Sequence, residues 1–163
     1  IDLYSGGGML TALLARACGA AYGIEVVQEA SACADELMEL NGLSGQMFNV
    51  CGTVEGELAG VFARTCGMSR VIVCDPPRKG MERSVTEAIK GCGADKVILV
   101  SCNPATLARD LGLLLGSLKD EGGVLKKTPD YASTSAYRIS YIQPYDMFPQ
   151  TKHVETLVLL CRV

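Results

Sequence analysis

The chain lacks the residue patterns that mark metal-binding and disulfide-rich proteins. It has no tryptophan and one histidine in 163 residues, and that residue, His153, has no ligand partner at zinc spacing. Its eight cysteines include no CxxC pair, so we predict no metal site. The cysteines are scattered through apolar helical and strand patterns, which favours a reduced, cytoplasmic chain over a secreted disulfide framework.

Long hydrophobic runs and an excess of positive charge are missing too. The longest apolar runs, in KVILVS and ETLVLLC, are the size of strands and far below the roughly 20 residues of a membrane span. The N-terminus has no basic segment followed by an apolar core, as a signal peptide would. With a net charge of −3, the chain has no overall field that attracts nucleic acid. We therefore expect no membrane partner, and a nucleic acid only at a local patch or through a further domain.

What the chain does contain is a regular alternation of strand-like and helix-like runs. Hydrophobic residues make up 48% and charged residues 20%, as in a globular chain with one core. We expect strands at 1–4, 21–25, 45–51, 70–74 and 96–101, and helices at 9–18, 28–42, 55–66, 83–90 and 104–118. This order predicts a doubly wound α/β fold with a mostly parallel sheet. After residue 119, strand runs without a long helix predict an antiparallel hairpin, and 128–137 is predicted to be a loop.

The motif DLYSGGG places Gly6 and Gly8 between the first strand and the first helix. Glycines there let the backbone approach a ligand and point amide groups at it, although a plain turn would need the same residues. The second strand ends at Glu25, whose carboxylate can accept hydrogen bonds from both ribose hydroxyls. Thr11 stands where a dinucleotide fingerprint has its last glycine, which favours a cofactor without a pyrophosphate, such as S-adenosylmethionine.

Two further motifs follow the fourth and fifth strands. In CDPPRKG, the double proline stiffens the strand exit and holds Asp75 at the carboxyl edge of the sheet, where α/β folds bind ligands. Arg78 and Lys79 beside it could take phosphates or could be ordinary surface residues. In SCNPATLARD, Cys102 precedes Pro104 at the start of a helix, where a cysteine could act as a thiolate nucleophile or pack as a small core residue.

The order and spacing of DPPRKG, SCNPATLARD and QPYDMFPQTKHVET resemble the RNA 5-methyluridine (uracil-5-) methyltransferase family. The first two motifs are more similar to the members that act on 23S ribosomal RNA than to the classical bacterial tRNA enzyme. The resemblance covers residues 1–163 and implies the catalytic, C-terminal domain of an S-adenosylmethionine-dependent enzyme, without the family's N-terminal RNA-binding and central domains. It also implies a Rossmann-like, seven-stranded sheet with a C-terminal antiparallel hairpin.

The resemblance assigns roles to individual residues. It makes Cys102 the nucleophile that attacks carbon 6 of a uridine, and Glu155 the general base. The cofactor would be bound by Tyr4, Gly6, Gly8, Glu25 and Asp75, and Asp75 would also position the uracil. Contacts to RNA are expected from Arg78, Lys79, Asn103 and His153. We expect 23S ribosomal RNA as partner more than tRNA, a monomeric fragment, and no iron–sulfur cluster, because no cysteine matches the family's cluster ligands.

Some features depart from the family or fit other functions. Thr53 stands where the family often has an aspartate, and the segment 126–137 is longer than usual. An amino-group methyltransferase is an alternative, because its [DN]PP motif also follows the fourth strand, but it has an aromatic residue where this chain has Arg78. A non-catalytic RNA-binding module that keeps only the fold is the other alternative.

Overall fold

The computed structural model describes residues 1–151 and 153–163, so Lys152 of the QPYDMFPQTKHVET motif lies outside the described residues. The chain divides into two compact units, Ile1–Asp75 and Pro76–Val163, and each is described by itself. A single domain over 1–163 stays a prediction.

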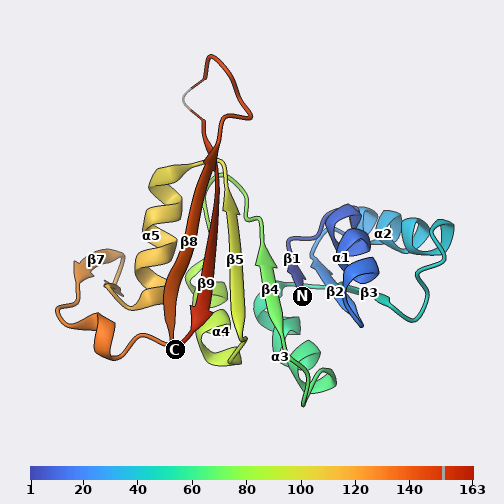
Figure 1. Cartoon of the computed structure of the whole chain (residues 1–163), viewed down its shortest axis with the longest axis horizontal. Coiled ribbons are helices and arrows are strands. Elements are labelled where there is room, and N and C mark those ends of the chain that lie inside the picture. Colours follow the sequence, from blue (N-terminus) through green and yellow to red (C-terminus); the bar gives the residue numbers. More distant parts are fainter. Residues whose placement is uncertain (152) are drawn as a thin grey trace. The chain divides into compact units, whose positions relative to one another are not determined.

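The first unit is a parallel α/β arrangement (Figure 1). Its four strands lie in the order β3-β2-β1-β4. They are β1 (Asp2–Leu3), β2 (Ala21–Glu25), β3 (Met47–Cys51) and β4 (Val71–Cys74). Three helices alternate with them: α1 (Met9–Ala17), α2 (Gln28–Leu40) and α3 (Val54–Arg64). Because the strands are parallel, their carboxyl ends meet at one edge, and the candidate ligand-binding residues follow these ends.

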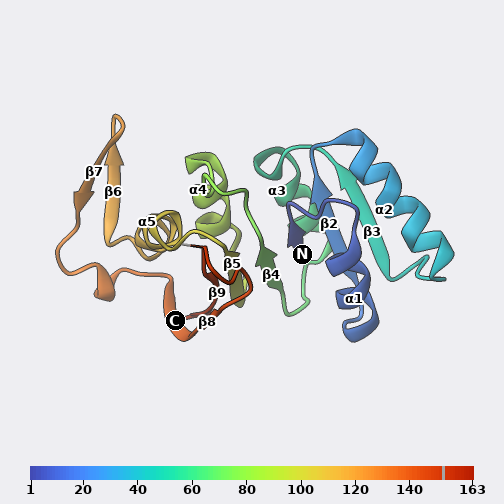
Figure 2. The same cartoon turned by 90° about the horizontal axis from the view of Figure 1, so that it is seen from above.

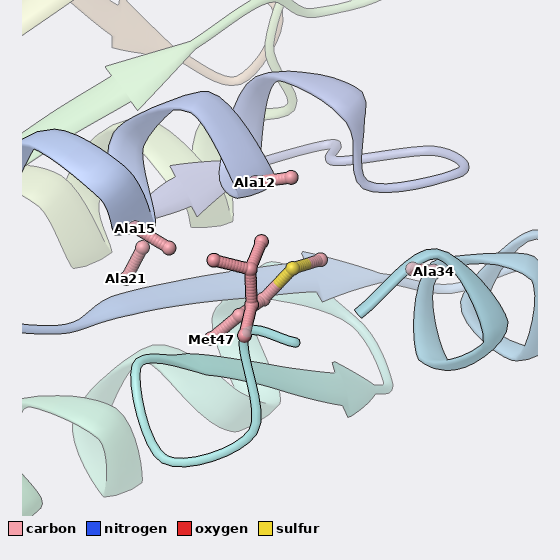
Figure 3. Packing of buried hydrophobic residues seen from close by; sticks show 6 residues of the cluster. Ala12, Ala15, Ala21, Ala34 and Met47 are labelled. Atoms are coloured by element: carbon pink, nitrogen blue, oxygen red, sulfur yellow. The ribbon is translucent and has the colours of Figure 1, made fainter. Parts of the chain in front are cut away.

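Small side chains let the helices of the first unit pack closely on the sheet. Figure 3 shows Met47 of β3 with Ala12 and Ala15 of α1, Ala21 of β2 and Ala34 of α2. All five are buried, with at most 9% of their surface exposed. The flexible methionine fills the space that the alanines leave. The core of this unit therefore lies next to the turn that precedes α1, because Ala34 and Met47 lie close to Gly8 of that turn.

The second unit combines antiparallel strands with two helices. Strands β5 (Lys96–Ser101), β9 (Glu155–Arg162) and β8 (Tyr137–Tyr145) lie in the order β5-β9-β8. Both pairings are antiparallel. The helices are α4 (Arg83–Cys92) and α5 (Pro104–Leu115). Strands β6 (Leu118–Glu121) and β7 (Val124–Lys127) form a separate two-stranded sheet, which Figure 2 shows extending away from β8 and β9.

The strands β5, β9 and β8 bury one of their two faces. The pairs Val97 with Leu160 and Leu99 with Val158 lie on this face, and each of these side chains is at most 1% exposed. Side chains alternate between faces along a strand, so the residues between them lie on the opposite face. That opposite face is half-buried at Ile98. The two faces therefore have different surroundings, which fixes the register of β5 on β9.

The predicted fold class is confirmed. Seven strands and intervening helices form a mostly parallel, doubly wound α/β arrangement, and β8 and β9 are the predicted C-terminal antiparallel hairpin. The helix expected over 104–118 ends at Leu115, because Gly116 takes a left-handed conformation with φ 79°. Strand β6 then begins at Leu118, and the predicted loop at 128–137 contains a 3₁₀ turn, η1 (Tyr131–Ser133). Among the described residues, no helix has the length and apolar character to span a membrane.

Candidate active site

The loop after β1 has an unusual backbone. Tyr4 has φ 63°, a left-handed conformation that is uncommon for residues other than glycine. Gly6 and Gly8 follow with φ 54° and 79°, and the Gly8 N–H donates to the Ser5 carbonyl at 3.0 Å. Strained backbone of this kind is concentrated at ligand sites. The sequence therefore folds here into a turn that ends β1 abruptly and starts α1 at Met9.

Glu25 accepts a backbone hydrogen bond at each carboxylate oxygen, one from this turn and one from the residue before α2. The Gly6 N–H donates to Oε2 at 2.9 Å, and the Val27 N–H donates to Oε1 at 2.8 Å. A carboxylate oxygen can accept more than one hydrogen bond, so each oxygen keeps capacity for a ligand hydroxyl. The two backbone bonds hold the carboxylate in one orientation. This geometry suits the predicted recognition of a ribose.

The three glycines of the turn face different surroundings. A β-carbon on Gly8 would lie 2.7 Å from Cβ of Ala34 and 2.7 Å from Cε of Met47, so core packing leaves no room for a side chain there. A β-carbon on Gly6 or Gly7 would meet no atom within 4 Å. Gly8 thus serves the packing of the fold, whereas the open space lies over Gly6 and Gly7. The cofactor-binding role predicted for Gly6 and Gly8 stays a prediction.

A buried acid beneath the turn was missed by the sequence analysis. Asp2 is 2% exposed, and its Oδ2 accepts a hydrogen bond from the Thr11 hydroxyl at 2.6 Å. Burial raises the pKa of Asp2, and the Thr11 bond opposes that rise. A β-carbon on Gly23 of β2 would lie 2.9 Å from the Thr11 hydroxyl oxygen. The bond between Thr11 and Asp2 therefore joins α1 to β1 on the two sides of the turn. The aspartate that opens the DLYSGGG motif is the feature of the sequence that could have predicted this bond.

Register brings the predicted cofactor residues together at the carboxyl edge of the first unit. Leu3 of β1 pairs with Ile24 on one side and Cys74 on the other. Tyr4, one residue further along, therefore lies between Glu25 and Asp75. Asp75 is exposed beyond the end of β4, and the protein around it excludes enough water to raise its pKa.

Cys102 and Glu155 are brought to one end of the second unit's sheet. Ser101 of β5 pairs with Thr156 of β9, and these are the last residues paired between the two strands. Cys102 follows Ser101 and Glu155 precedes Thr156, so both residues lie one position beyond this last pair. Ser101 and Thr156 lie on the buried face, so Glu155 belongs to the other face of β9, and both Cys102 and Glu155 are half-buried.

The residues after Cys102 form a capped helix start. The Asn103 side-chain oxygen accepts a hydrogen bond from the Ala105 N–H at 3.1 Å, and Pro104 occupies the first turn of α5. This is the preferred chemistry of a helix N-terminus. The Asn103 amide also donates to the Arg78 carbonyl at 3.4 Å. The predicted contact of Asn103 with RNA stays a prediction, since its side chain here joins two protein segments.

The other predicted RNA contacts lie on the surface of the second unit. Arg78 and Lys79 are exposed, and Lys79 forms an ion pair with Glu82 at 2.6 Å. The hydrogen bond from Lys79 lowers the pKa of Glu82. Because this pair is solvated, a phosphate can compete for Lys79 at little cost. His153 is half-buried, and its ring meets Phe148 edge to face with the ring centres 6.3 Å apart.

Comparison with solved structures places the fold in a known class. The structure matches the tRNA (uracil-54, C5)-methyltransferase of Pyrococcus abyssi, solved with S-adenosyl-L-homocysteine, at a TM-score of 0.70 and 24% identity. The match covers 98% of this chain and 33% of that one. An rRNA methylase of Streptococcus thermophilus matches at a TM-score of 0.66 and 14% identity, over 99% of this chain and 85% of that one. The chain has the Rossmann-like fold of these methyltransferases.

Sequence comparison gives the family within that class. Residues 57–121 match the family model for tRNA (uracil-5-)-methyltransferase. An uncharacterized RNA methyltransferase of Caldanaerobacter subterraneus is 36% identical over 163 residues, 100% of this chain and 32% of that protein. One from Halalkalibacterium halodurans is 38% identical over 160 residues, 98% of this chain and 31% of that protein. The predicted resemblance to the RNA (uracil-5-)-methyltransferase family is confirmed. It spans about a third of the length of these curated relatives.

Proposed function

We propose that this chain is the catalytic part of an enzyme that transfers a methyl group from S-adenosylmethionine to carbon 5 of a uridine in RNA. The observation that carries the proposal is the pairing of Ser101 with Thr156, which brings the Cys102 thiol and the Glu155 carboxylate to the same end of adjoining strands. Such an enzyme needs a nucleophile and a base that act on one uracil ring. Cysteine and glutamate are suited to these two tasks.

The first unit supports the choice of cofactor. The Glu25 carboxylate is held by two backbone N–H groups and can still accept bonds from ribose hydroxyls. The open space over Gly6 and Gly7 leaves room for a ligand against the backbone. The structure from Pyrococcus abyssi contains S-adenosyl-L-homocysteine, the product of this cofactor. Tyr4, Gly6, Glu25 and Asp75 would hold S-adenosylmethionine here.

The reaction requires carbon 5 of uracil to become a nucleophile. The Cys102 thiolate adds to carbon 6, and the electron pair of the carbon 5–carbon 6 double bond becomes available at carbon 5. When bound, S-adenosylmethionine would supply an electrophilic methyl group to carbon 5, and S-adenosyl-L-homocysteine would leave with the electron pair of the broken sulfur–methyl bond. Glu155 then removes the proton from carbon 5, the double bond forms again, and Cys102 leaves carbon 6 as a thiolate. A positioned base contributes roughly 10²- to 10⁴-fold to such a step.

We infer 23S ribosomal RNA as the substrate, on the basis of the DPPRKG and SCNPATLARD motifs. The target uridine must leave its stack to reach the half-buried thiol of Cys102, so an unpaired or loop nucleotide is the expected site. Arg78 and Lys79 are exposed on one loop and can contact the phosphates around it. Mapping 5-methyluridine by mass spectrometry, in cells with and without the gene, distinguishes ribosomal RNA from tRNA. A loss of 5-methyluridine from tRNA alone would contradict this choice of substrate.

The mechanism is tested with RNA in which 5-fluorouridine replaces uridine. Fluorine at carbon 5 cannot leave as a proton, so Cys102 should stay covalently bound to carbon 6 in the presence of the cofactor. The adduct is detected as a shifted band on a denaturing gel and located by peptide mass spectrometry. Cys102→Ala should abolish it, whereas Cys161→Ala, which alters another half-buried cysteine of the second unit, should not. Methylation of uridine by Cys102→Ala would rule out the proposed mechanism.

A further inference from the structure

The last residue of the SCNPATLARD motif, Asp110, is a buried carboxylate that accepts three hydrogen bonds. Asp110 lies on α5, and its side chain is only 2% exposed. Its Oδ2 accepts a hydrogen bond from the Met81 N–H at 2.8 Å. Its Oδ1 accepts from Nε and Nη2 of Arg109 at 2.8 and 2.6 Å. Both oxygens therefore have partners, as a buried carboxylate requires.

Arg109 completes a closed set of contacts to the loop that precedes α4. Its Nη2 also donates to the Met81 carbonyl at 3.1 Å. The Met81 backbone thus has its donor bound to Asp110 and its acceptor bound to Arg109. Next to Met81, Gly80 has φ 79°, and a β-carbon there would collide with Arg109 Nη2 and Asp110 Oδ2. The loop can come this close to α5 only because residue 80 is a glycine.

A second set of contacts fixes the same loop to the beginning of α5. The Arg78 carbonyl accepts a hydrogen bond from the Asn103 amide and another from the Thr106 hydroxyl, each at 3.4 Å. The loop 76–82 is therefore attached to α5 at its first turn and again one and a half turns later. Cys102 lies immediately before that first turn.

We propose that Asp110, together with Arg109, is a positioning residue of the methyl-transfer site. The pair holds the loop 76–82 against α5, so that Arg78 and Lys79 keep a constant position relative to Cys102. This inference rests on the proposed function, because it assigns the pair to the placement of an RNA substrate over the thiol. Neither side chain touches the substrate in this proposal.

The chemistry of the contacts favours positioning over simple packing. A buried ion pair is seldom more stabilising than apolar residues of similar volume, so stability alone does not explain a carboxylate at this place. A charge-assisted bond to a backbone N–H fixes direction as well as distance. The double proline at 76–77 stiffens the same loop from its other end. A displacement of about 1 Å at a reacting group can lower a rate roughly 100-fold, so holding this loop has a measurable effect.

The test compares Asp110→Asn with Asp120→Asn in the full-length protein. Both variants change one aspartate that accepts a backbone N–H bond, because Asp120 accepts from the Gly123 N–H at 2.7 Å in the β6–β7 turn. Asparagine at 110 keeps the size of the side chain but cannot accept from Arg109 and Met81 together. We expect Asp110→Asn to slow adduct formation with 5-fluorouridine RNA by roughly 10- to 100-fold. Binding of S-adenosylmethionine should be unchanged, and Asp120→Asn should behave as the wild type.

Two more variants separate positioning from folding. Arg109→Lys keeps a positive charge beside Asp110 but lacks the planar fork that bonds both Asp110 and the Met81 carbonyl, so an intermediate rate is expected. Gly80→Ala should push the loop 76–82 away from Arg109 and Asp110 without removing any polar group from the protein. It should lower the adduct rate as Asp110→Asn does. If Asp110→Asn does not fold, the rates of adduct formation by Arg109→Lys and Gly80→Ala test the positioning role instead. Each rate is measured at a temperature at which the variant is folded.

The outcomes distinguish the two proposals. If the wild type forms an adduct and the folded variants form it at the wild-type rate, the positioning role is wrong and the proposed function stands. A lower melting temperature with unchanged rates would show that the pair serves stability only, which also overturns the inference. If the wild type forms no adduct with 5-fluorouridine RNA, the proposed function itself fails.

Discussion

Ser101 at the end of β5 pairs with Thr156 near the start of β9, an antiparallel contact between residues 55 positions apart in the chain. This one pair determines that Cys102, which follows Ser101, and Glu155, which precedes Thr156, lie at the same end of the adjoining strands. The antiparallel direction of β9 is essential, because a parallel strand would carry Glu155 to the opposite end of the sheet. The second unit alone thus contains both groups that the proposed reaction at uracil requires.

Replacing the proposed base should trap the reaction after methyl transfer. Glu155→Gln keeps the shape of the side chain but cannot take the proton from carbon 5, so Cys102 cannot leave carbon 6. We expect product formation to fall by roughly 10²- to 10⁴-fold. A covalent complex with unmodified RNA should accumulate, with a mass that includes the new methyl group.

Glu121→Gln is the matched control for that variant. Glu121 is exposed in β6 and forms an ion pair with Lys126 at 2.6 Å, so its loss should leave the rate unchanged. Normal turnover by Glu155→Gln would show that another group removes the proton.

Changing Glu25 should weaken cofactor binding. In Glu25→Gln the side-chain NH₂ must face the N–H of Gly6 or of Val27, and neither can accept a bond from it. A hydrogen bond to a charged group is worth about 1.5–3 kcal/mol, so we expect the Kd for S-adenosylmethionine to rise roughly 10- to 100-fold. Isothermal titration calorimetry measures this change. Glu29→Gln, an exposed change in the first turn of α2, is the control and should bind normally.

The glycines of the turn should respond differently to the same substitution. Gly8→Ala places a methyl group against Ala34 and Met47, and overpacking of this kind costs roughly 1–3 kcal/mol. Gly7→Ala meets open space and should change the free energy of unfolding by less than about 0.5 kcal/mol. Urea unfolding measures both. Equal destabilisation by the two variants would contradict the packing role of Gly8.

Stability should fall at high pH because of one buried tyrosine. Burial raises the pKa of Tyr137 to about 12, and the side chain is 1% exposed at the start of β8. The folded state keeps the phenol proton that the unfolded chain loses near pH 10. The contribution of Tyr137 to stability is therefore complete below pH 10 and is lost as the pH rises towards 12, by about 3 kcal/mol in all.

Tyr137→Phe removes this titration. Urea unfolding at pH 8 and pH 11 should show a steeper loss of stability for the wild type than for the variant. Tyr131→Phe, at an exposed residue of η1, should retain the wild-type pH dependence. Parallel behaviour of wild type and Tyr137→Phe would show that the buried phenol does not set the slope.

Most of the fold was predictable because local patterns agree with it. The periodic apolar residues place the alternating elements, and Asn103 with Pro104 marks the start of α5 correctly. The end of α5 was predicted three residues too late. Apolar residues continue through Leu118, but the left-handed conformation of Gly116 stops the helix and Leu118 enters β6. Periodicity alone does not show where a glycine will interrupt it.

The sequence by itself determined the class of fold, the motifs and the kinds of side chain available at the strand ends, because these depend on local composition and order. Only the tertiary structure decided which of them meet. It showed that Gly8 is required by the packing of Met47 and Ala34, that Asp2 and Thr11 support the turn, and that Asp110 holds the Met81 loop. These relations join residues distant in the chain, and strand register and side-chain packing fix them only when the whole unit has folded.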